Sequence, residues 1–274
     1  MAVFRLDPCG IICILITYSA LLYADYVVVV HMVIPSMSDT LWGAFHAVIF
    51  NLFLFLLTVS HVRAVFSDPG IVPLPEAHLD FSDMHSGNNK KKLLEKKEGQ
   101  PAGWTVCLKC ETYRPPRAHH CRICQRCIKR MDHHCPWINN CVGEYNQKFF
   151  IQFLVYVGIS SCYALSLTVG SWIIDPQGTS PRTRHTRVLH TVLLVVECVL
   201  FGIFVMAIGC DQISAILSDE TLVEQVKKEG PRRHRPKMAL LAEVFGKGHP
   251  LLWLCPFQPL SGVSSTDANK QFIV

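Results

Sequence analysis

The sequence predicts an integral membrane, all-α protein with four transmembrane helices and a cytosolic cysteine-rich domain between the second and third helices. Three observations support this fold class. Half of the 274 residues are hydrophobic, and they gather in four long runs. Between the second and third runs, residues 107–141 hold seven of the thirteen cysteines together with four histidines. Most of the 26 lysines and arginines lie on the same side of the predicted membrane as this stretch.

Each apolar run is long enough to cross a bilayer, because about 20 apolar residues suffice for a transmembrane helix. The runs are Gly10–Ile34, Leu41–Phe66, Phe149–Ile174 and Val188–Ile216. The valines at 27–30 would also suit a buried strand, but four such runs could not share one soluble core. Polar residues inside spans are costly and often functional, and here they are Asp25, Asn51, Glu197 and Asp211.

The spans divide the chain into five parts. These are the N-terminus with helices 1 and 2 (1–66), a linker that opens with an Asp-Pro-Gly turn (67–106), the cysteine-rich domain (107–148), helices 3 and 4 (149–216) and a tail (217–274). Only Arg182, Arg184 and Arg187 fall in the loops on the opposite side, so the positive-inside rule predicts that both termini and the cysteine-rich domain are cytosolic. The lysine-rich segment 90–97 would face anionic lipid, and without interleaved aromatic residues it does not indicate nucleic acid.

The spacing of the cysteines indicates two metal sites. The cysteines with CxxC spacing are Cys107, Cys110, Cys121, Cys124 and Cys127. A CxxC turn suits tetrahedral zinc, which takes four ligands. Six cysteines and two histidines would fill two closed sites, whereas a single zinc would leave several thiols open to oxidation. The cysteine left over is Cys135, which follows two histidines, precedes Pro136 and lies outside any CxxC pair.

These residues resemble the DHHC cysteine-rich domain of protein S-acyltransferases, also called palmitoyltransferases. The family pattern C-x2-C-x9-H-C-x2-C-x2-C-x4-D-H-H-C-x5-C-x4-N-x3-F is matched at every marked position from Cys107 through Asn146 to Phe150. The four spans and the turn at Asp68-Pro69-Gly70 agree as well, so the resemblance covers nearly the whole chain. The cysteine-rich stretch is most similar to Golgi-type members, which implies a Golgi or endoplasmic reticulum membrane.

The resemblance implies a role for each residue of the stretch. One structural zinc would take Cys107, Cys110, His120 and Cys127, and the other Cys121, Cys124, His134 and Cys141. His119 would be left out. Cys135 would be the nucleophile, His133 its base, and Asp132 the carboxylate that orients the imidazole. In the third span, Ser160 would line the acyl-chain cavity, where its small side chain leaves room for a long chain.

The implied activity is transfer of a long-chain acyl group, mainly palmitoyl, from acyl-CoA through acyl-Cys135 to cysteines of membrane or membrane-associated proteins. Basic residues that could bind the CoA phosphates are Arg114, Arg117, Arg122, Arg126, Lys129, Arg130 and Lys148. The alternative is a catalytically weak membrane scaffold that binds partners through its zinc module. A zinc transporter is disfavoured because the ligands lie in a loop and not across the spans.

Two departures from the family pattern concern the tail. The TTxE motif after the fourth span reads Thr221-Leu222-Val223-Glu224, and Leu240 stands where an asparagine usually precedes the Val-Phe-Gly segment. Both put the packing of the tail, and with it the activity, in question. The chain ends on Phe272-Ile273-Val274, a hydrophobic carboxyl terminus of the kind that PDZ domains bind, although a frayed tail is the alternative.

Overall fold

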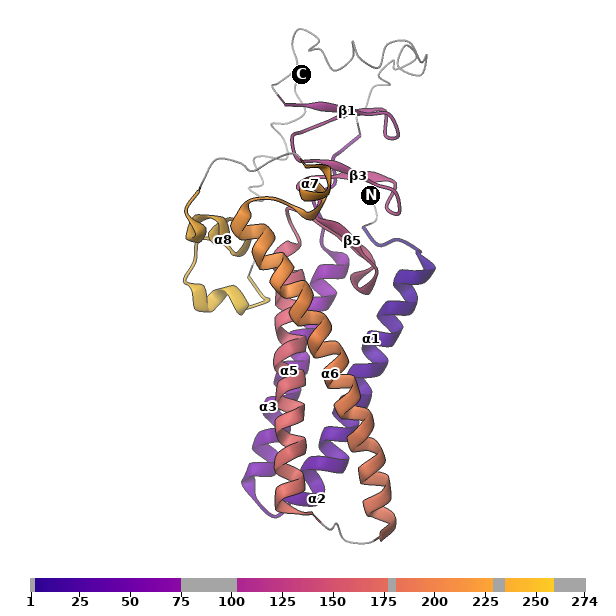
Figure 1. The fold of residues 1–274 in the computed structure, drawn as a ribbon, viewed down its shortest axis with the longest axis vertical. Coiled ribbons are helices and arrows are strands. Elements are labelled where there is room, and N and C mark those ends of the chain that lie inside the picture. The colour runs from indigo at the N-terminus through magenta and orange to yellow at the C-terminus, as the bar shows by residue number, and fades with distance from the viewer. Residues whose placement is uncertain (1–2, 75–102, 177–180, 229–234, 259–274) are drawn as a thin grey trace.

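The computed structural model describes residues 3–74, 103–176, 181–228 and 235–258. A long helical bundle carries a small domain of short strands at one end, and the described N-terminal and C-terminal segments lie at that same end (Figure 1). The lysine-rich segment 90–97 and the carboxyl terminus 272–274, with their predicted lipid and PDZ contacts, lie outside the described residues.

Four helical segments of the bundle are long and apolar enough to span a membrane, as the sequence predicts. They are Pro8–Met37, Leu41–Phe66, Gln147–Ile174 and Arg184–Ser218. The first comprises α1 (Pro8–Tyr26), the π-helix η1 (Val27–Val33) and α2 (Ile34–Met37); the others are α3 (Leu41–Phe66), α5 (Gln147–Ile174) and most of α6 (Pro181–Ser218). Half of the most apolar window of α5 is buried, against 17–22 % for the other three, so α5 is the central helix.

The valine run at 27–30 is helical, so the strand alternative is wrong. It lies in the π-helix η1, directly before Pro35. Proline has no N–H to return to the preceding turn and its ring crowds the carbonyl four residues earlier, which favours a locally wider helix. Near the start of this π-helix, Asn51 of α3 donates a 3.1 Å hydrogen bond to Asp25 of α1, which joins two of the polar residues singled out in the predicted spans.

The fourth helix begins at Pro181, earlier than the predicted Val188. The added residues, about two turns, include Arg187, whose side chain is buried and donates to the backbone and carboxylate of Asp175 and to Ser171 at the end of α5. The loop between α5 and α6 is therefore shorter than predicted, and one of its three basic residues is engaged inside the protein.

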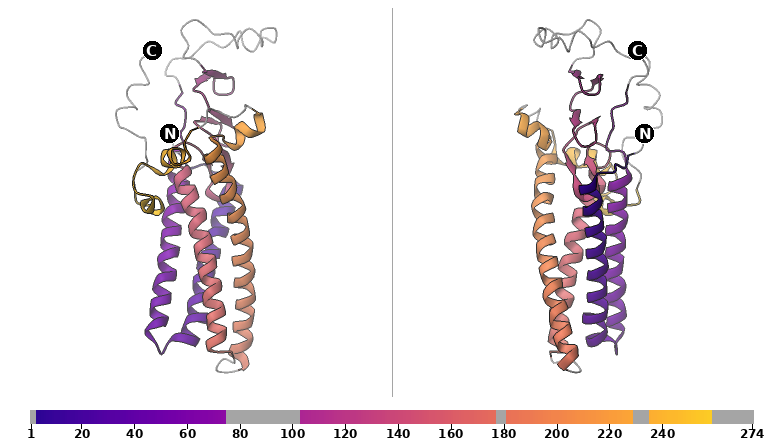
Figure 2. Two further views of the ribbon diagram at one scale, coloured as in Figure 1. Left: turned by 60° about the vertical axis from the view of Figure 1, so that its left-hand side comes forward. Right: turned by 90° about the vertical axis from the view of Figure 1, so that its right-hand side faces the viewer.

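The cysteine-rich domain is built from three antiparallel hairpins rather than from helices. They are β1 (Thr105–Cys107) with β2 (Thr112–Arg114), β3 (His119–Cys121) with β4 (Arg126–Ile128), and β5 (His133–Cys135) with β6 (Asn140–Val142). The all-α prediction thus holds for the bundle and not for this domain. The strands lie beyond the end of the bundle, with β5 nearest to it (Figures 1 and 2).

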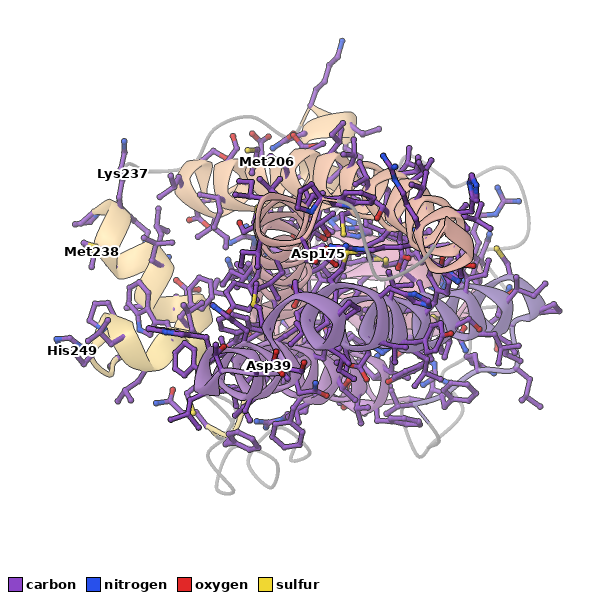
Figure 3. All side chains as sticks on the ribbon, turned by 90° about the horizontal axis from the view of Figure 1, so that it is seen from below. Asp39, Asp175, Met206, Lys237, Met238 and His249 are labelled. Carbon is purple, nitrogen blue, oxygen red and sulfur yellow. The ribbon has the colours of Figure 1, made fainter. Side chains whose placement is uncertain are left out.

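The tail forms α7 (Leu222–Lys227), α8 (Lys237–Phe245) and the 3₁₀ turn η3 (Pro250–Leu254). Seen along the bundle, α8 with Lys237 and Met238 lies to one side of the spanning helices, and so does His249 (Figure 3). Three polar side chains one turn apart on α5 hold this segment by donating to its backbone carbonyls: Lys148 to Phe245, Gln152 to Trp253 and Cys255, and Tyr156 to Leu254.

The departure at Leu240 does not leave the tail unpacked. The Leu240 side chain is 4 % exposed and lies in an apolar cluster with Ile151, Ile216 and Phe245. At position 240 an apolar residue thus stands in apolar surroundings, where asparagine is usual. The tail is held instead by the hydrogen bonds from the three α5 side chains.

Candidate active site and metal centres

The three hairpins repeat one geometry at a constant spacing along the chain. The first strand of each ends on a cysteine: Cys107, Cys121 and Cys135. After each turn comes a residue with positive φ: Glu111 (47°), Gln125 (53°) and Asn139 (46°). The residue just before that one is a second cysteine in the first two hairpins, Cys110 and Cys124, but it is Ile138 in the third. The third hairpin therefore has the shape of a metal-binding turn with only one of its two thiols.

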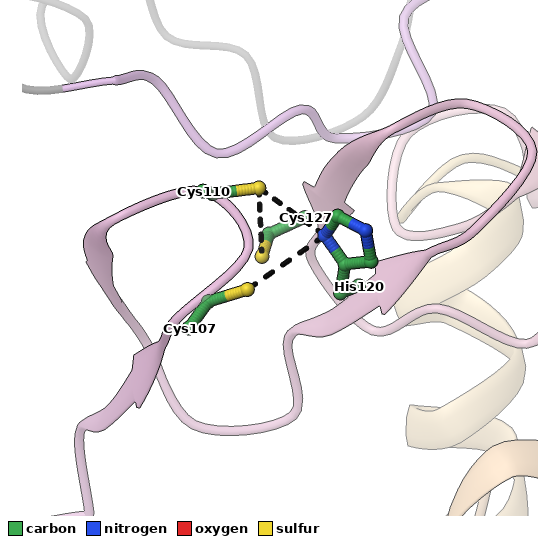
Figure 4. A group of neighbouring side chains, drawn as sticks. All are labelled: Cys107, Cys110, His120 and Cys127. Atoms are coloured by element: carbon green, nitrogen blue, oxygen red, sulfur yellow. Dashed lines mark hydrogen bonds between the residues drawn. The ribbon is translucent and has the colours of Figure 1, made fainter. Parts of the chain in front are cut away.

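The structure brings the eight expected ligands together in two groups. The first is Cys107, Cys110, His120 and Cys127, and the second is Cys121, Cys124, His134 and Cys141; within each group the ligand atoms lie within 4.8 Å of one another (the first is drawn in Figure 4). One hairpin supplies the two turn cysteines of each group. The next supplies a cross-strand pair, His120 opposite Cys127 or His134 opposite Cys141.

The spacing of the donor atoms fits zinc. Tetrahedral zinc with Zn–S bonds of about 2.3 Å sets neighbouring donors about 3.7 Å apart. In the first group, Nδ1 of His120 lies 3.7 Å from the Cys107 sulfur and 3.2 Å from the Cys110 sulfur. In the second, Nδ1 of His134 lies 3.4 Å from Cys124 and 3.7 Å from Cys141. His119 belongs to neither group, and its Nδ1 lies 2.7 Å from Nζ of Lys227.

Strand β5 carries a candidate metal ligand on one face and the candidate nucleophile on the other. Side chains alternate between the two faces of a strand, so His134 points toward the second metal group while His133 and Cys135 share the other face. Cys135 is 5 % exposed and packs in an apolar cluster with Leu57, Phe153 and Val205 of the spanning helices. The strand thus directs Cys135, the one cysteine of the cysteine-rich domain outside both metal groups, toward the bundle.

Asp132 and His133 form the contact that the family resemblance implies. Nδ1 of His133 lies 2.7 Å from Oδ2 of Asp132. Burial favours the neutral imidazole, but the hydrogen bonds that His133 donates to Asp132 and to the Cys135 sulfur, together with the charges of these groups, outweigh burial and raise the pKa of His133 to about 9. Burial also disfavours the Asp132 carboxylate, yet its hydrogen bonds hold the pKa of Asp132 below its usual value. Asp132 is therefore an anion that orients and supports an imidazolium.

Two further donors to Asp132 come from outside the cysteine-rich domain, and neither was predicted from the sequence. Gln212 near the end of α6 donates a 2.6 Å hydrogen bond to Oδ2, and the backbone N–H of Leu222 donates one of 2.8 Å to Oδ1. Leu222 is the residue that departs from TTxE. Its side chain is 47 % exposed, so the substitution leaves the backbone donor in place. Gln212 could have been singled out from the sequence, because it is an amide within the last turns of an otherwise apolar span.

The remainder of this motif anchors α7 to the domain. Thr221 and Glu224 form a reciprocal capping box at the start of α7. The Glu224 carboxylate also receives two hydrogen bonds from Arg117, at 2.9 and 3.0 Å, and Arg117 pairs with Asp219 at 2.8 Å. Glu224 is 1 % exposed, so this is a buried ion-pair cluster.

Three of the basic residues predicted as candidates for CoA phosphates have structural contacts instead. Arg117 is engaged by Asp219 and Glu224, Arg130 pairs with Glu243 of α8, and Lys148 is buried beneath the tail. Positive charge in the sequence did not reveal these acidic partners, because the tail that supplies them lies far along the chain from the cysteine-rich domain.

An apolar cavity lies among the four spanning segments beneath Cys135. It has about 660 Å³ of empty space, part of it open to the outside, and its lining includes Leu57, Phe153 and Val205, which also pack in the Cys135 cluster. Ser160, predicted to line an acyl-chain cavity, is in this lining, and its buried hydroxyl has no hydrogen-bond partner among the described residues.

Comparison with known proteins agrees with the site. The family model for the DHHC palmitoyltransferase matches residues 101–229. Palmitoyltransferase ZDHHC3 from Homo sapiens is 40 % identical over 262 residues, which cover 93 % of this chain and 83 % of the relative. Palmitoyltransferase ZDHHC7 from Mus musculus is 38 % identical, covering 93 % and 80 %. "Probable protein S-acyltransferase 12" from Arabidopsis thaliana is 34 % identical, covering 76 % and 71 %.

The fold and site define a multi-pass membrane enzyme whose cysteine-rich domain carries two cysteine–histidine metal groups and one further cysteine that packs close to an apolar cavity. The chain belongs to the DHHC palmitoyltransferase family. It is a protein S-palmitoyltransferase, as the names of its relatives indicate.

Proposed function

We propose that this chain moves a long-chain acyl group, mainly palmitoyl, from acyl-CoA to cysteines of membrane or membrane-associated proteins through an acyl-Cys135 intermediate. The observation that supports this best is that Asp132 directly precedes strand β5, that His133 and Cys135 lie on one face of this strand, and that Cys135 packs with residues that also line an apolar cavity. A hydrogen-bonded carboxylate and imidazole beside a thiol are the groups that activate a cysteine nucleophile.

In the first step the proton of Cys135 lies on His133, whose raised pKa favours the imidazolium, and the thiolate attacks the carbonyl carbon of the acyl-CoA thioester. The Nδ1 atom of His133 is held by Asp132, which leaves Nε2 for this proton. The bond to the Cys135 sulfur forms, the bond to the CoA sulfur breaks, and the proton passes to the departing CoA thiolate. General acid–base catalysis of this kind raises a reaction rate by about 10²- to 10⁴-fold.

In the second step a cysteine thiol of the substrate protein attacks acyl-Cys135. His133 takes the proton of the incoming thiol and returns it to Cys135. One thioester replaces another in both steps, so no energy-rich co-reactant is needed. The acyl chain stays in the cavity between the steps, since each buried CH₂ contributes about 0.8 kcal/mol. Ser160 is proposed to leave room for a long chain there.

The eight cysteine and histidine ligands are proposed to hold two structural zinc ions. Bound zinc would link each hairpin to the next, since every group draws two ligands from one hairpin and two from the following one. The ions would thereby fix β5, and neither site has a position left for substrate.

The cysteine-rich domain and both termini are proposed to face the cytosol, in a Golgi or endoplasmic reticulum membrane. The distribution of lysine and arginine supports this orientation, and the described N-terminal and C-terminal segments lie at the same end of the bundle as the cysteine-rich domain (Figure 1). The Golgi or endoplasmic reticulum address rests on the similarity to Golgi-type members. A PDZ partner for Phe272-Ile273-Val274 is a further proposal, testable by pull-down with and without these residues.

The proposed function is tested by incubating the zinc-loaded, purified chain with palmitoyl-CoA and measuring a hydroxylamine-sensitive acyl adduct. The wild type should gain one adduct, and Cys135→Ser should gain none while keeping its fold. Cys162→Ser, at an exposed cysteine of α5, is the matched control and should behave as wild type. A wild type without any adduct would instead favour the scaffold alternative.

A further inference from the structure

The first spanning segment places a second thiol beside the candidate nucleophile, and the proposed reaction does not use it. This thiol is Cys13 of α1, which is half-buried, whereas Cys9, one turn earlier on the same helix, is exposed. A Cys135 thiolate and the Cys13 thiol are close enough to interact electrostatically, although 122 residues of sequence separate them. The packing of α1 shows how the fold brings the two sulfurs together.

The start of α1 packs directly on the turn of the third hairpin. A Cβ at Gly10 would lie 2.2 Å from Oδ1 of Asn139, so this contact requires glycine. The side-chain amide of Asn139 also donates a 2.7 Å hydrogen bond to the backbone carbonyl of Arg5, just before the helix. A helix rises about 1.5 Å per residue, so Cys13 lies about 4.5 Å along α1 from Gly10. Cys13 is therefore less than one helical turn from the hairpin that carries Cys135.

Cys13 also lies on the face of α1 that lines the apolar cavity. Successive spacings of four, three and four residues, which keep side chains on one side of a helix, connect Cys13, Thr17, Ala20 and Ala24. The last three of these line the cavity. Thr17 is buried, and its hydroxyl donates a 2.9 Å hydrogen bond to the backbone carbonyl of Cys13. Cys13 thus lies at the end of the cavity nearest to the third hairpin.

The apolar packing around Cys135 reaches the same part of α1. Ile14, the residue after Cys13, and Leu21 pack against the apolar cluster that contains Cys135. Leu21 also lines the cavity. The third hairpin, the start of α1 and the cavity therefore meet at one place, and an acyl chain that enters the cavity from Cys135 would lie beside the Cys13 thiol.

We propose that Cys13 is a second acylation site, which receives the acyl group from acyl-Cys135 of the same chain. The inference rests on the proposed function, because acyl-Cys135 is the donor. The Cys13 sulfur forms a bond to the carbonyl carbon of the thioester, the bond from that carbon to the Cys135 sulfur breaks, and the proton of Cys13 passes to the Cys135 sulfur. One thioester replaces another, so the transfer needs no co-reactant.

The acyl chain stays in the apolar cavity during this exchange, since each buried CH₂ contributes about 0.8 kcal/mol. The same cavity holds the chain on either sulfur, so the thioester is carried by Cys135 or by Cys13 and not by both at once. Cys9 is exposed and lies one turn farther from the cavity lining, and it receives no acyl group. Cys13 thereby keeps the acyl group within the protein while the Cys135 thiol is free.

The test locates the acyl group after the zinc-loaded chain has been incubated with palmitoyl-CoA, by peptic digestion at acid pH and tandem mass spectrometry. Each wild-type chain should carry one acyl group, found on Cys135 and on Cys13 in comparable amounts because both forms are alkyl thioesters. Cys13→Ser should confine the acyl group to Cys135 and keep the zinc content. Cys9→Ser, one turn away on α1, is the matched control and should leave the distribution unchanged.

An acyl group on Cys135 alone in the wild type would overturn the inference and leave the proposed function intact. Absence of acylation at every cysteine would instead reject the proposed function itself. Acylation of Cys13 in Cys135→Ser would mean that Cys13 reacts directly with palmitoyl-CoA, and it too would overturn the transfer. A mixture of Cys135→Ser with Cys13→Ser should leave the first variant unacylated, and acylation of it would contradict transfer within one chain.

The proximity of the two thiols is checked independently of acylation. Dibromobimane becomes fluorescent when it bridges two neighbouring thiols, and in Cys9→Ser it should join Cys13 to Cys135. The further replacement Cys13→Ser should abolish the bridged peptide. Failure to find that peptide in Cys9→Ser would contradict the arrangement on which the inference depends.

Discussion

The side-chain amide of Gln212 donates a 2.6 Å hydrogen bond to the carboxylate of Asp132, across 80 residues of sequence. The fourth spanning helix thereby contacts the group that orients His133. Because Gln212 is also joined to Gln147 at the start of α5, the two helices that lead into the cavity meet at the candidate active site. A change in how these two helices pack would therefore alter the hydrogen bonding of the Asp132 carboxylate.

Replacement of Gln212 by leucine should slow acylation of Cys135 by about tenfold, because a hydrogen bond to a charged group contributes about 1.5–3 kcal/mol. The measurement is single-turnover acylation with palmitoyl-CoA, with bound zinc determined in parallel and expected to stay unchanged. Asp211→Asn, at the exposed neighbouring position, is the control. A wild-type rate in Gln212→Leu would show that Asp132 does not need this donor.

Metal analysis should find two zinc ions per chain, and chelation should abolish acylation because the hairpins that hold β5 come apart. Cys124→Ser should lower the zinc content, since Cys124 lies in the second group. Cys135→Ser should keep both ions, because Cys135 belongs to neither. Loss of zinc from Cys135→Ser would contradict the assignment of the remaining cysteine as the nucleophile.

Truncation of Arg117 to alanine should lower the free energy of unfolding by about 3–5 kcal/mol, because removal of one member of a buried ion pair is strongly destabilising. Arg117 donates two hydrogen bonds to the Glu224 carboxylate, which is 1 % exposed, whereas Asp219 keeps Arg130 and Arg235 as partners. The readout is the thermal transition of the protein in detergent, compared with Arg122→Ala at an exposed position of the same domain. Equal thermal transition temperatures for Arg117→Ala and Arg122→Ala would mean that the ion-pair cluster does not stabilise the fold.

The variant Leu240→Asn, which introduces the residue usual in the family, should destabilise the tail by about 1–3 kcal/mol, the cost of a buried amide without partners. Leu240 has apolar neighbours here. Limited proteolysis of the tail would report the change, and Met238→Asn, at an exposed position of the same helix, should leave it unaltered. If the tail of Leu240→Asn were cleaved more slowly than that of the wild type, backbone groups near this position would be hydrogen-bonding to the new amide.

The local parts of the site were predictable from the sequence. A CxxC turn brings its two thiols together within one short turn, so the spacing indicates a shared ligand site wherever the turn lies. The assignment of His120 and His134 rather than His119 came from the family resemblance, and the structure brings these two residues into the two groups. Four long apolar runs likewise predict spanning helices without any knowledge of how they pack.

The contacts that connect distant parts were not predictable in the same way. Leu222 contributes its backbone N–H, which every residue other than proline carries, so no side-chain pattern marks it. Gln212 carried a signal only as a polar residue in an apolar run. The basic residues of the cysteine-rich domain were visible as charge, but the acidic tail residues that engage Arg117 and Arg130 are brought near only by folding.

The third hairpin shows how the proposed nucleophile could have arisen. Its turn repeats the backbone of the two hairpins that carry the candidate metal ligands, with Asn139 in the same left-handed conformation as Glu111 and Gln125, but Ile138 stands where the others carry a second sulfur. Cys135 therefore has the position of one half of a chelating pair without the other half. On the proposed mechanism, a turn that twice would hold metal is converted by one side chain into a turn that could carry a thioester.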